Sequence, residues 1–160
     1  MGHLRRRMLD PKQPLAIVLK SDSKLDEVVS LFWRTGFTNI AGYLVGGMSA
    51  WAQAGLPMDH MQQIDVYTLY KDLTSVQVLD VRALQELSSG RIPNAKHIYL
   101  PELPDRMGEL NKKTPVVTYC GTGYRASIAS SLLRQAGFED VRNVPGSWIA
   151  WKKAELPIEK

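Results

Sequence analysis

The chain has 160 residues, of which 44% are hydrophobic and 22% charged, so it has the size and balance of one ordinary globular domain with some surplus. Its formal net charge of +4 comes with basic residues that are scattered apart from one short run, which excludes the clustered basic stripe of a nucleic-acid-binding surface. Its one cysteine excludes an internal disulfide and the usual multi-cysteine zinc site, and the three histidines lack the spacing of metal ligands. We expect no metal, no cofactor and no nucleic-acid partner.

The first residues carry a basic run and no apolar targeting segment. The arginines at positions 5–7 are followed by Asp10 and Pro11 instead of a signal-peptide core. The longest apolar run, residues 15–19, is far too short to cross a bilayer. We therefore expect a cytoplasmic protein without a membrane partner, and we interpret residues 1–13 as a flexible basic N-terminal tail.

An internal repeat organises the rest of the chain. Residues 14–37 match residues 115–138 at an offset of 101, and the residues from Gly46 onward match those from Gly146 onward at an offset of 100. The identical pairs include Ser30/Ser131, Leu31/Leu132, Gly36/Gly137, Phe37/Phe138, Gly46/Gly146, Ala50/Ala150, Trp51/Trp151, Ala54/Ala154, Leu56/Leu156 and Pro57/Pro157. Each copy is predicted to form a strand, a helix, a short strand and a second helix.

The first copy, residues 14–58, is predicted to be half a domain. Nothing before Pro14 supplies an equivalent of residues 64–110, so this piece leaves a parallel-sheet edge and apolar helix faces uncovered and is not expected to be stable alone. Three arrangements fit this pattern. The piece packs on the complete domain, it packs on another copy of the chain in a homodimer, or the polypeptide is cut from a longer one that supplies a fused partner domain.

Residues 60–160 are predicted to form a complete domain. Its expected elements are a helix over 64–72 with Asp65 as N-cap, a strand over 76–81, a helical turn over 83–89 ended by Gly90, strands over 95–100 and 115–119, a helix closed by Gly137, a strand over 141–144 and a last helix stopped by Pro157. Strands that alternate with helices predict the α/β class, with an open parallel sheet covered by helices on both faces.

The segment 120–125 carries the candidate chemistry. Cys120 follows the predicted strand over 115–119, at the carboxyl end where open parallel sheets place reactive groups. Glycines at positions 121 and 123 permit positive φ and let consecutive N–H groups point inward, and the next helix dipole and the Arg125 charge favour a thiolate over a thiol. We expect Cys120 to be a nucleophile, with a substrate-binding loop made of Gly121, Thr122, Gly123, Tyr124 and Arg125.

A lone cysteine at the end of an apolar strand is more often a small buried hydrophobic residue. The glycine-rich loop and the arginine that follow Cys120 argue for a nucleophile instead. The first copy has Leu19 at the matching position, followed by polar residues 20–24 in place of the glycine loop, so we expect it to be inactive.

The order and spacing of these residues resemble the rhodanese family over residues 64–158. The matching segments are Asp80-Val81-Arg82, Glu86, Gly90-Arg91-Ile92-Pro93-Asn94-Ala95, the loop 120–125, and Pro145-Gly146-Ser147 leading to Trp151. The sequence departs from the family pattern at Arg91, where histidine is usual, and at Asn94 and Ser147, where glycines are. We interpret these three positions as shaping connections more than chemistry.

The resemblance implies a rhodanese-like open parallel sheet and a sulfurtransferase activity. It also implies that Asp80, Arg82 and Glu86 form a structural polar network under the active loop. A cysteine-less repeat before an active one is similar to the C-terminal part of fusion proteins in which a metallo-β-lactamase-fold persulfide dioxygenase precedes two rhodanese domains. That similarity implies a sulfide or persulfide metabolic setting and adds no metal to this chain.

The working hypothesis is a two-step transfer. Cys120 takes a sulfane sulfur from thiosulfate, polysulfide or a small persulfide, and passes it to a thiol or cyanide acceptor. One alternative is a cysteine phosphatase on the same fold, although phosphatase loops of that kind carry one residue more than residues 121–124 between cysteine and arginine. The other alternative is a non-catalytic docking module of a larger sulfide-oxidising enzyme, which the inactive first copy suggests.

Overall fold

The computed structural model describes residues 10–160, which form two compact units that divide between Asp59 and His60. The first nine residues of the predicted basic tail, with the three arginines at 5–7, lie outside the described residues. The remaining four, residues 10–13, form a turn in which the Gln13 amide donates to the carbonyl of Asp10. Within residues 10–160 no helix has the length and the apolar character needed to cross a membrane.

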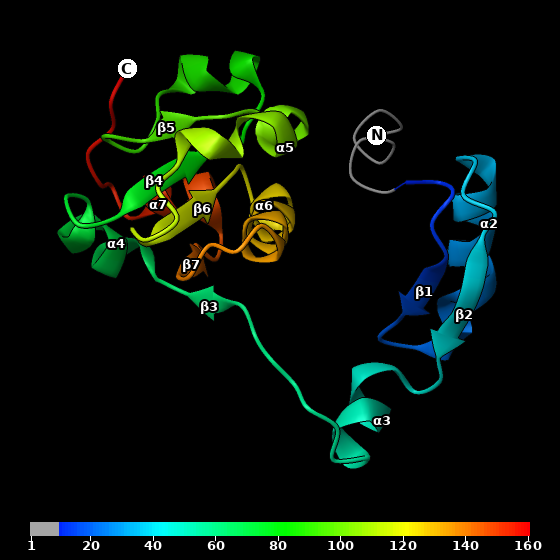
Figure 1. Cartoon of the computed structure of the whole chain (residues 1–160). Coiled ribbons are helices and arrows are strands. Elements are labelled where there is room, and N and C mark those ends of the chain that lie inside the picture. Colours follow the sequence, from blue (N-terminus) through cyan, green and yellow to red (C-terminus); the bar gives the residue numbers. More distant parts are fainter. Residues whose placement is uncertain (1–9) are drawn as a thin grey trace. The chain divides into compact units, whose positions relative to one another are not determined.

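The second unit is built on a five-stranded sheet in which every neighbouring pair is parallel (Figure 1). In spatial order the strands are β3 (Gln62–Gln63), β7 (Val141–Asn143), β6 (Val116–Tyr119), β4 (Gln77–Asp80) and β5 (Lys96–His97). The register places Tyr119 of β6 opposite Asp80 of β4, so the carboxyl ends of these two strands meet at the same edge. Cys120 therefore starts its loop at that edge.

Helices cover both faces of this sheet. The main ones are α4 (Val66–Asp72), α6 (Tyr124–Gln135) and α7 (Ser147–Lys153), with shorter turns at η2 (Leu84–Ser89), η3 (Leu100–Glu102), α5 (Leu103–Arg106) and η4 (Met107–Glu109). Figure 1 shows α5 and α6 on one face and α4 and α7 on the other. The α/β architecture expected from the sequence, an open parallel sheet with helices on both faces, is confirmed.

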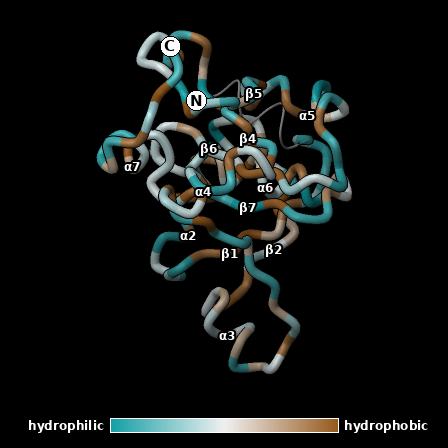
Figure 2. The backbone as a smooth tube through the Cα atoms, turned by 90° about the vertical axis from the view of Figure 1, so that its left-hand side faces the viewer, coloured by the Kyte–Doolittle hydropathy of each residue, from teal (hydrophilic) through white to brown (hydrophobic). Residues whose placement is uncertain are grey.

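The core follows the two-residue period of the strands. Val117 and Tyr119 of β6 pack with Trp148 and Trp151 of α7 in one buried cluster, whereas Thr118 points to the other face and bonds Ser130 of α6 at 2.7 Å. Figure 2 shows hydrophobic residues gathered in the middle of this unit, where β4, β6 and β7 lie. The central strand is buried on both faces, as expected of a parallel sheet.

The expected elements of the second unit occur with two differences. Asp65 is the N-cap of α4, where its carboxylate accepts the Tyr67 and Thr68 amides at 2.9 and 3.1 Å. The strand expected over 95–100 shrinks to β5, because the chain turns into the 3₁₀ helix η3 from Leu100. The edge strand β3 has no apolar pattern, so periodicity did not predict it.

The first unit contains a parallel strand pair and two helices. Its elements are β1 (Leu15–Val18), the 3₁₀ turn η1 (Asp22–Lys24), α2 (Leu25–Arg34), β2 (Ile40–Leu44) and α3 (Gly47–Gln53). This is the same order of strand, helix, strand and helix as in β6, α6, β7 and α7. The register of β1 with β2 shifts between Leu15 and Ala16, and a shift of this kind accommodates the extra residue by which the sequence offset falls from 101 to 100.

Several hydrogen bonds occur in both units at the expected offsets. The indole N–H of Trp51 donates to the carbonyl of Pro57 at 2.9 Å, and that of Trp151 donates to Pro157 at the same distance. The Phe37 amide donates to a carbonyl in the last turn of α2 as the Phe138 amide does in α6. The two segments thus share local geometry as well as residue order.

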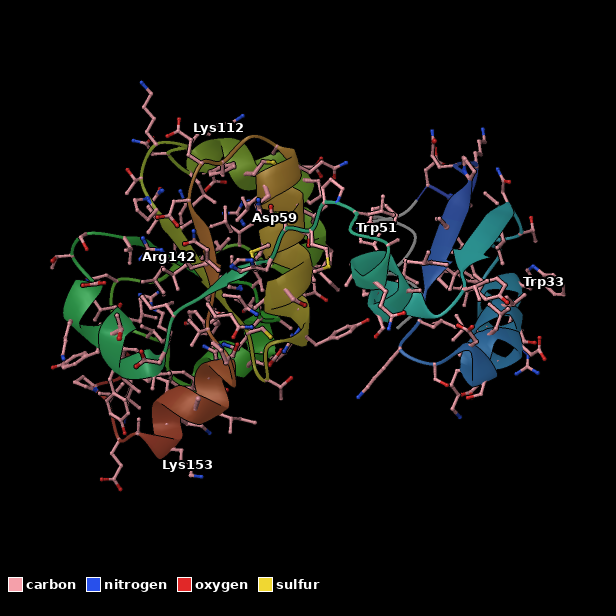
Figure 3. All side chains as sticks on the ribbon, turned by 90° about the horizontal axis from the view of Figure 1, so that it is seen from below. Trp33, Trp51, Asp59, Lys112, Arg142 and Lys153 are labelled. Carbon is pink, nitrogen blue, oxygen red and sulfur yellow. The ribbon has the colours of Figure 1, made fainter. Side chains whose placement is uncertain are left out.

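The two units differ in what is buried and in how the loop after the first strand closes. Val18 is 50% exposed, whereas Tyr119 at the matching position is fully buried, and Figure 3 shows Trp33 projecting outward from α2. In the first unit the carboxylate of Asp22 accepts the Gly46 amide through both oxygens, at 3.2 and 3.0 Å. A negative side chain therefore closes the segment that corresponds to the predicted active loop.

Candidate active site

Cys120 lies at the end of β6 with its side chain enclosed by backbone amides. The residue is 1% exposed, and the Gly123 amide donates to Sγ at 3.2 Å. Burial alone would raise the pKa of the thiol, but the amides of Ala126, Gly123, Thr122 and Arg125 outweigh it, so the pKa of Cys120 lies below its ordinary value. The thiol is buried, yet its surroundings are polar and favour the thiolate.

The two glycines of the loop serve different purposes. Gly123 has φ of 112°, and it is the N-cap of α6. Gly121 does not adopt positive φ, which corrects the reason expected from the sequence. A Cβ at Gly121 would lie 3.3 Å from Nη2 of Arg125 and 3.6 Å from Oε1 of Glu86, so a side chain there would crowd Arg125.

Arg125 and Glu86 form a two-contact ion pair beside the loop. Nη1 of Arg125 lies 2.5 Å from Oε2 of Glu86 and Nη2 lies 2.8 Å from Oε1. The hydrogen bond from Arg125 holds the pKa of Glu86 below its ordinary value, against the effect of burial. The hydrogen bond to Glu86 raises the pKa of the Arg125 guanidinium against the effect of burial, and an interaction with Cys120 adds a smaller contribution. The positive charge of Arg125, which was predicted to bind substrate, therefore interacts with both the Cys120 thiol and the Glu86 carboxylate.

The other two loop side chains face solvent. Thr122 is exposed and Tyr124 is 69% exposed. The structure thus brings all six residues 120–125 to one edge of the sheet, with the thiol inside and these two side chains outside. No group of acidic, histidine or cysteine side chains within residues 10–160 is arranged to hold a metal ion.

Asp80 and Arg82 form a buried network behind the loop. Nε and Nη2 of Arg82 donate to the Asp80 carboxylate at 3.0 and 2.7 Å, and both side chains are almost fully buried. The Tyr119 hydroxyl donates to the same carboxylate at 2.6 Å. The guanidinium of Arg82 stacks 4.6 Å from the ring of Trp148.

This network connects to the ion pair through η2. Nη2 of Arg82 donates to the carbonyl of Gly90 at 2.8 Å and Nη1 donates to that of Glu86 at 3.3 Å. The Glu86 carboxylate in turn accepts the Ala83 amide at 3.0 Å. Arg82 thus holds the segment that presents Glu86 to Arg125, and it does not itself contact the residues of the loop through any hydrogen bond seen in residues 10–160.

The start of α7 holds the first two residues of the loop. The Cys120 amide donates to Oγ of Ser147 at 3.2 Å, and the Trp148 amide donates to the Cys120 carbonyl at 2.9 Å. The Ile149 amide donates to the carbonyl of Gly121 at 3.2 Å. Three consecutive residues of one helix therefore fix the backbone that carries the thiol.

Comparison with known proteins identifies this arrangement. The family model described as "Rhodanese-like domain" matches residues 65–154, which is more than half of the chain. The chain belongs to the rhodanese-like family. The match spans the buried network, the loop 120–125 and the helix that holds it.

Relatives and solved structures agree with this assignment. A protein of Allochromatium vinosum named "Sulfurtransferase" is 38% identical over 87 residues, which are 54% of this chain and 81% of that protein. "Thiosulfate sulfurtransferase GlpE" of Vibrio cholerae is 32% identical over 104 residues, which are 64% of this chain and 98% of that protein. A rhodanese-like domain protein of Staphylococcus aureus is 33% identical with a TM-score of 0.56, over 62% of this chain and 100% of its own.

Two of the departures from the rhodanese pattern serve a contact with the end of the chain. Arg91 pairs with Glu159 both as an antiparallel bridge and as a side-chain ion pair. The Asn94 amide donates to the Glu159 carboxylate at 3.1 Å, and Asn94 has φ of 60°. These two positions shape a connection, as the sequence suggested, whereas Ser147 contacts the candidate nucleophile.

Sequence reasoning missed two residues of this rhodanese site. Tyr119 immediately precedes Cys120 and reaches Asp80, a contact that the parallel pairing of their strands would have suggested. Ser147 was interpreted as a connecting residue because a glycine is usual there. Its departure from glycine in a sharp turn was the signal that its side chain has a use.

Proposed function

We propose that this rhodanese-like domain is a sulfurtransferase that carries sulfur on Cys120. The Cys120 thiolate attacks the outer sulfur of a donor such as thiosulfate, polysulfide or a small persulfide. A bond forms between Sγ and that sulfur, the sulfur–sulfur bond of the donor breaks, and its electron pair leaves with the product, which is sulfite, a shortened polysulfide or a thiolate. An acceptor thiol or cyanide then attacks the outer sulfur of the Cys120 persulfide and restores the thiolate.

The amides directed at the thiol are the observation that carries this proposal. They lower the pKa of Cys120 although the residue is buried, and the same donors suit the negative outer sulfur of a persulfide. Arg125 adds a positive charge next to them, which the Glu86 carboxylate holds in place. Relatives named sulfurtransferases support this kind of chemistry.

Intact mass spectrometry after treatment with a sulfur donor tests the proposal. The wild-type chain should gain the mass of a sulfur atom, lose it again on addition of cyanide, and release thiocyanate. Because Cys120 is the only cysteine, the Cys120→Ser variant should show none of these changes. A wild-type chain that never gains sulfur, and that behaves as the variant does, would refute the proposal in favour of a docking module.

In this proposal residues 14–58 are a partial rhodanese repeat without a chemical role. The shared tryptophan hydrogen bonds and element order support the repeat. Leu19 stands where the second unit has Cys120, so the first unit offers no cysteine to carry sulfur. The sulfur donors and thiol acceptors are therefore expected to act only on the loop 120–125.

A further inference from the structure

Ser147 is a buried serine in a backbone conformation that favours glycine. Its φ is 50°, and it is fully buried. The other non-glycine residues with positive φ within residues 10–160, Asn94 and Glu155, are exposed. Residues held in such conformations persist where the surrounding structure enforces them, and they cluster at functional sites.

The hydrogen bonds of the Ser147 side chain explain why a serine stands here in place of a glycine. Its Oγ accepts the Cys120 amide at 3.2 Å and donates to the carbonyl of Val144 at 3.1 Å. The hydroxyl is thus satisfied as both acceptor and donor. A glycine at this position would relieve the backbone but would leave the Cys120 amide without this acceptor.

The contact bears on the direction of the thiol. The Trp148 amide holds the Cys120 carbonyl at 2.9 Å, so consecutive residues fix both backbone polar groups of Cys120. Once the peptide planes on both sides of a residue are fixed, the direction of its Cα–Cβ bond is fixed as well. From that Cβ position Sγ reaches the amides of Thr122, Gly123, Arg125 and Ala126. The Trp148 contact is made by backbone, whereas the Ser147 contact is made by a side chain that can be replaced.

The first unit provides a contrast. Gly47 occupies the matching position there, with φ of 58°. A Cβ at Gly47 would lie 2.1 Å from the carbonyl oxygen of Leu19, so no side chain fits. The space for a side chain exists only in the unit that carries the cysteine.

We propose that Ser147 is a positioning residue for Cys120, whose hydroxyl holds the Cys120 amide so that Sγ faces the loop amides. This inference rests on the proposed sulfurtransferase function. Ser147 need not contact substrate to act in this way. The inference predicts that the hydroxyl of Ser147, and not the packing volume of its side chain, sets the reactivity of the Cys120 thiol.

Two substitutions separate the hydroxyl from the backbone strain. Ser147→Gly removes both, and Ser147→Ala removes the hydroxyl but keeps a Cβ at positive φ. Both variants should lose sulfur transfer by about threefold to tenfold in kcat, the range expected for one hydrogen bond, with little change in the KM for the donor. Thermal stability should differ between them, with Ser147→Gly above Ser147→Ala.

Titration of the thiolate absorbance of Cys120 supplies a readout that a packing role would not move. In both variants the pKa of Cys120 should rise by up to about one unit, while the charged neighbours Arg125 and Glu86 are unchanged. Glu155→Gly is the matched control, because Glu155 is exposed, has φ of 53° and lies at the far end of α7. That variant should gain stability and keep the wild-type pKa of Cys120.

The outcomes distinguish this inference from the function on which it rests. If the wild-type chain takes up no sulfur, the proposed function fails. If the wild-type chain takes up sulfur and Ser147→Gly matches it in kcat and in the pKa of Cys120, the positioning role is overturned. A loss confined to Ser147→Ala, in step with its stability, also overturns the positioning role in favour of a structural one.

Discussion

The carboxylate of Glu86 lies 2.5 and 2.8 Å from the two terminal nitrogens of Arg125, next to the loop that carries Cys120. Arg125 is the charged neighbour of the Cys120 thiol, and Glu86 is paired with that charge. We expect the reactivity of Cys120 to depend on the balance between these two charges as well as on the amides.

Glu86→Gln should lower the pKa of Cys120. Glutamine keeps the size of the side chain and an oxygen that can accept from Arg125, but it removes the negative charge that offsets Arg125. The effect should appear as a shift of the thiolate titration to lower pH. Glu109→Gln is the control, because Glu109 of η4 is paired with Arg106 of α5, and no hydrogen bond or ion pair seen in residues 10–160 joins it to the loop. An unchanged or raised pKa in Glu86→Gln would contradict this balance of charges.

Sulfur uptake should fall as the pH falls through the pKa of Cys120. The folded thiol has a pKa below the ordinary value of about 8.5, so the thiolate is present over a range where an unfolded cysteine is protonated. Because the folded pKa is lowered, ionisation of Cys120 favours folding fully above the unfolded pKa, and this contribution is lost as pH falls through the folded pKa. Thiolate absorbance of the wild-type chain, with Cys120→Ser subtracted, should titrate at lower pH in buffer than in urea. Equal titration midpoints in buffer and in urea would show that the backbone amides around Sγ do not lower the pKa of Cys120.

Gly121→Ala should weaken the ion pair. The added Cβ would lie 3.3 Å from Nη2 of Arg125, so the guanidinium must move away by a few tenths of an ångström. We expect kcat for sulfur transfer to fall about threefold to tenfold, comparable to the loss of one hydrogen bond. Gly108→Ala is the matched control, because a Cβ at Gly108 meets nothing within 4 Å. Equal kinetics for the two variants would show that Gly121 is not needed for packing.

Tyr119→Phe should reduce stability more than it reduces activity. The substitution removes the 2.6 Å hydrogen bond to Asp80 and leaves the Ile92 amide without the tyrosine hydroxyl that accepts it. We expect a loss of about 1 to 3 kcal/mol in the unfolding of the second unit, since a buried donor loses its partner. Urea denaturation followed by tryptophan fluorescence measures it. If the variant unfolds at the same urea concentration as the wild-type chain, the Tyr119 hydroxyl does not contribute to the stability of the second unit.

The active loop could be predicted because its residues are contiguous. Six neighbouring residues, 120–125, contain the candidate nucleophile, the two glycines and the positive charge, and the end of an apolar strand fixes where they lie. The Asp65 cap was predictable for the same reason, since a capping side chain acts within three residues of itself.

The remaining parts of the site depend on residues distant in sequence. Ser147 meets Cys120 across 27 residues and Glu159 meets Arg91 across 68, and neither contact leaves a local pattern. The reason why residue 121 is a glycine was misjudged, because the nearby Glu86 side chain belongs to η2, which is distant from Gly121 in the sequence. Such contacts follow from packing of the whole unit and not from local propensity.

Asp22 shows why the first unit could not be made reactive by one substitution. Replacing Leu19 with cysteine would put a thiol into a loop already occupied by an internal anion, the carboxylate that holds the Gly46 amide. A negative charge in the same loop disfavours the thiolate form. The Gly46 amide already donates to Asp22 and is not available to an anionic sulfur. A second reaction centre would therefore need the whole loop, residues 20–24, to be replaced.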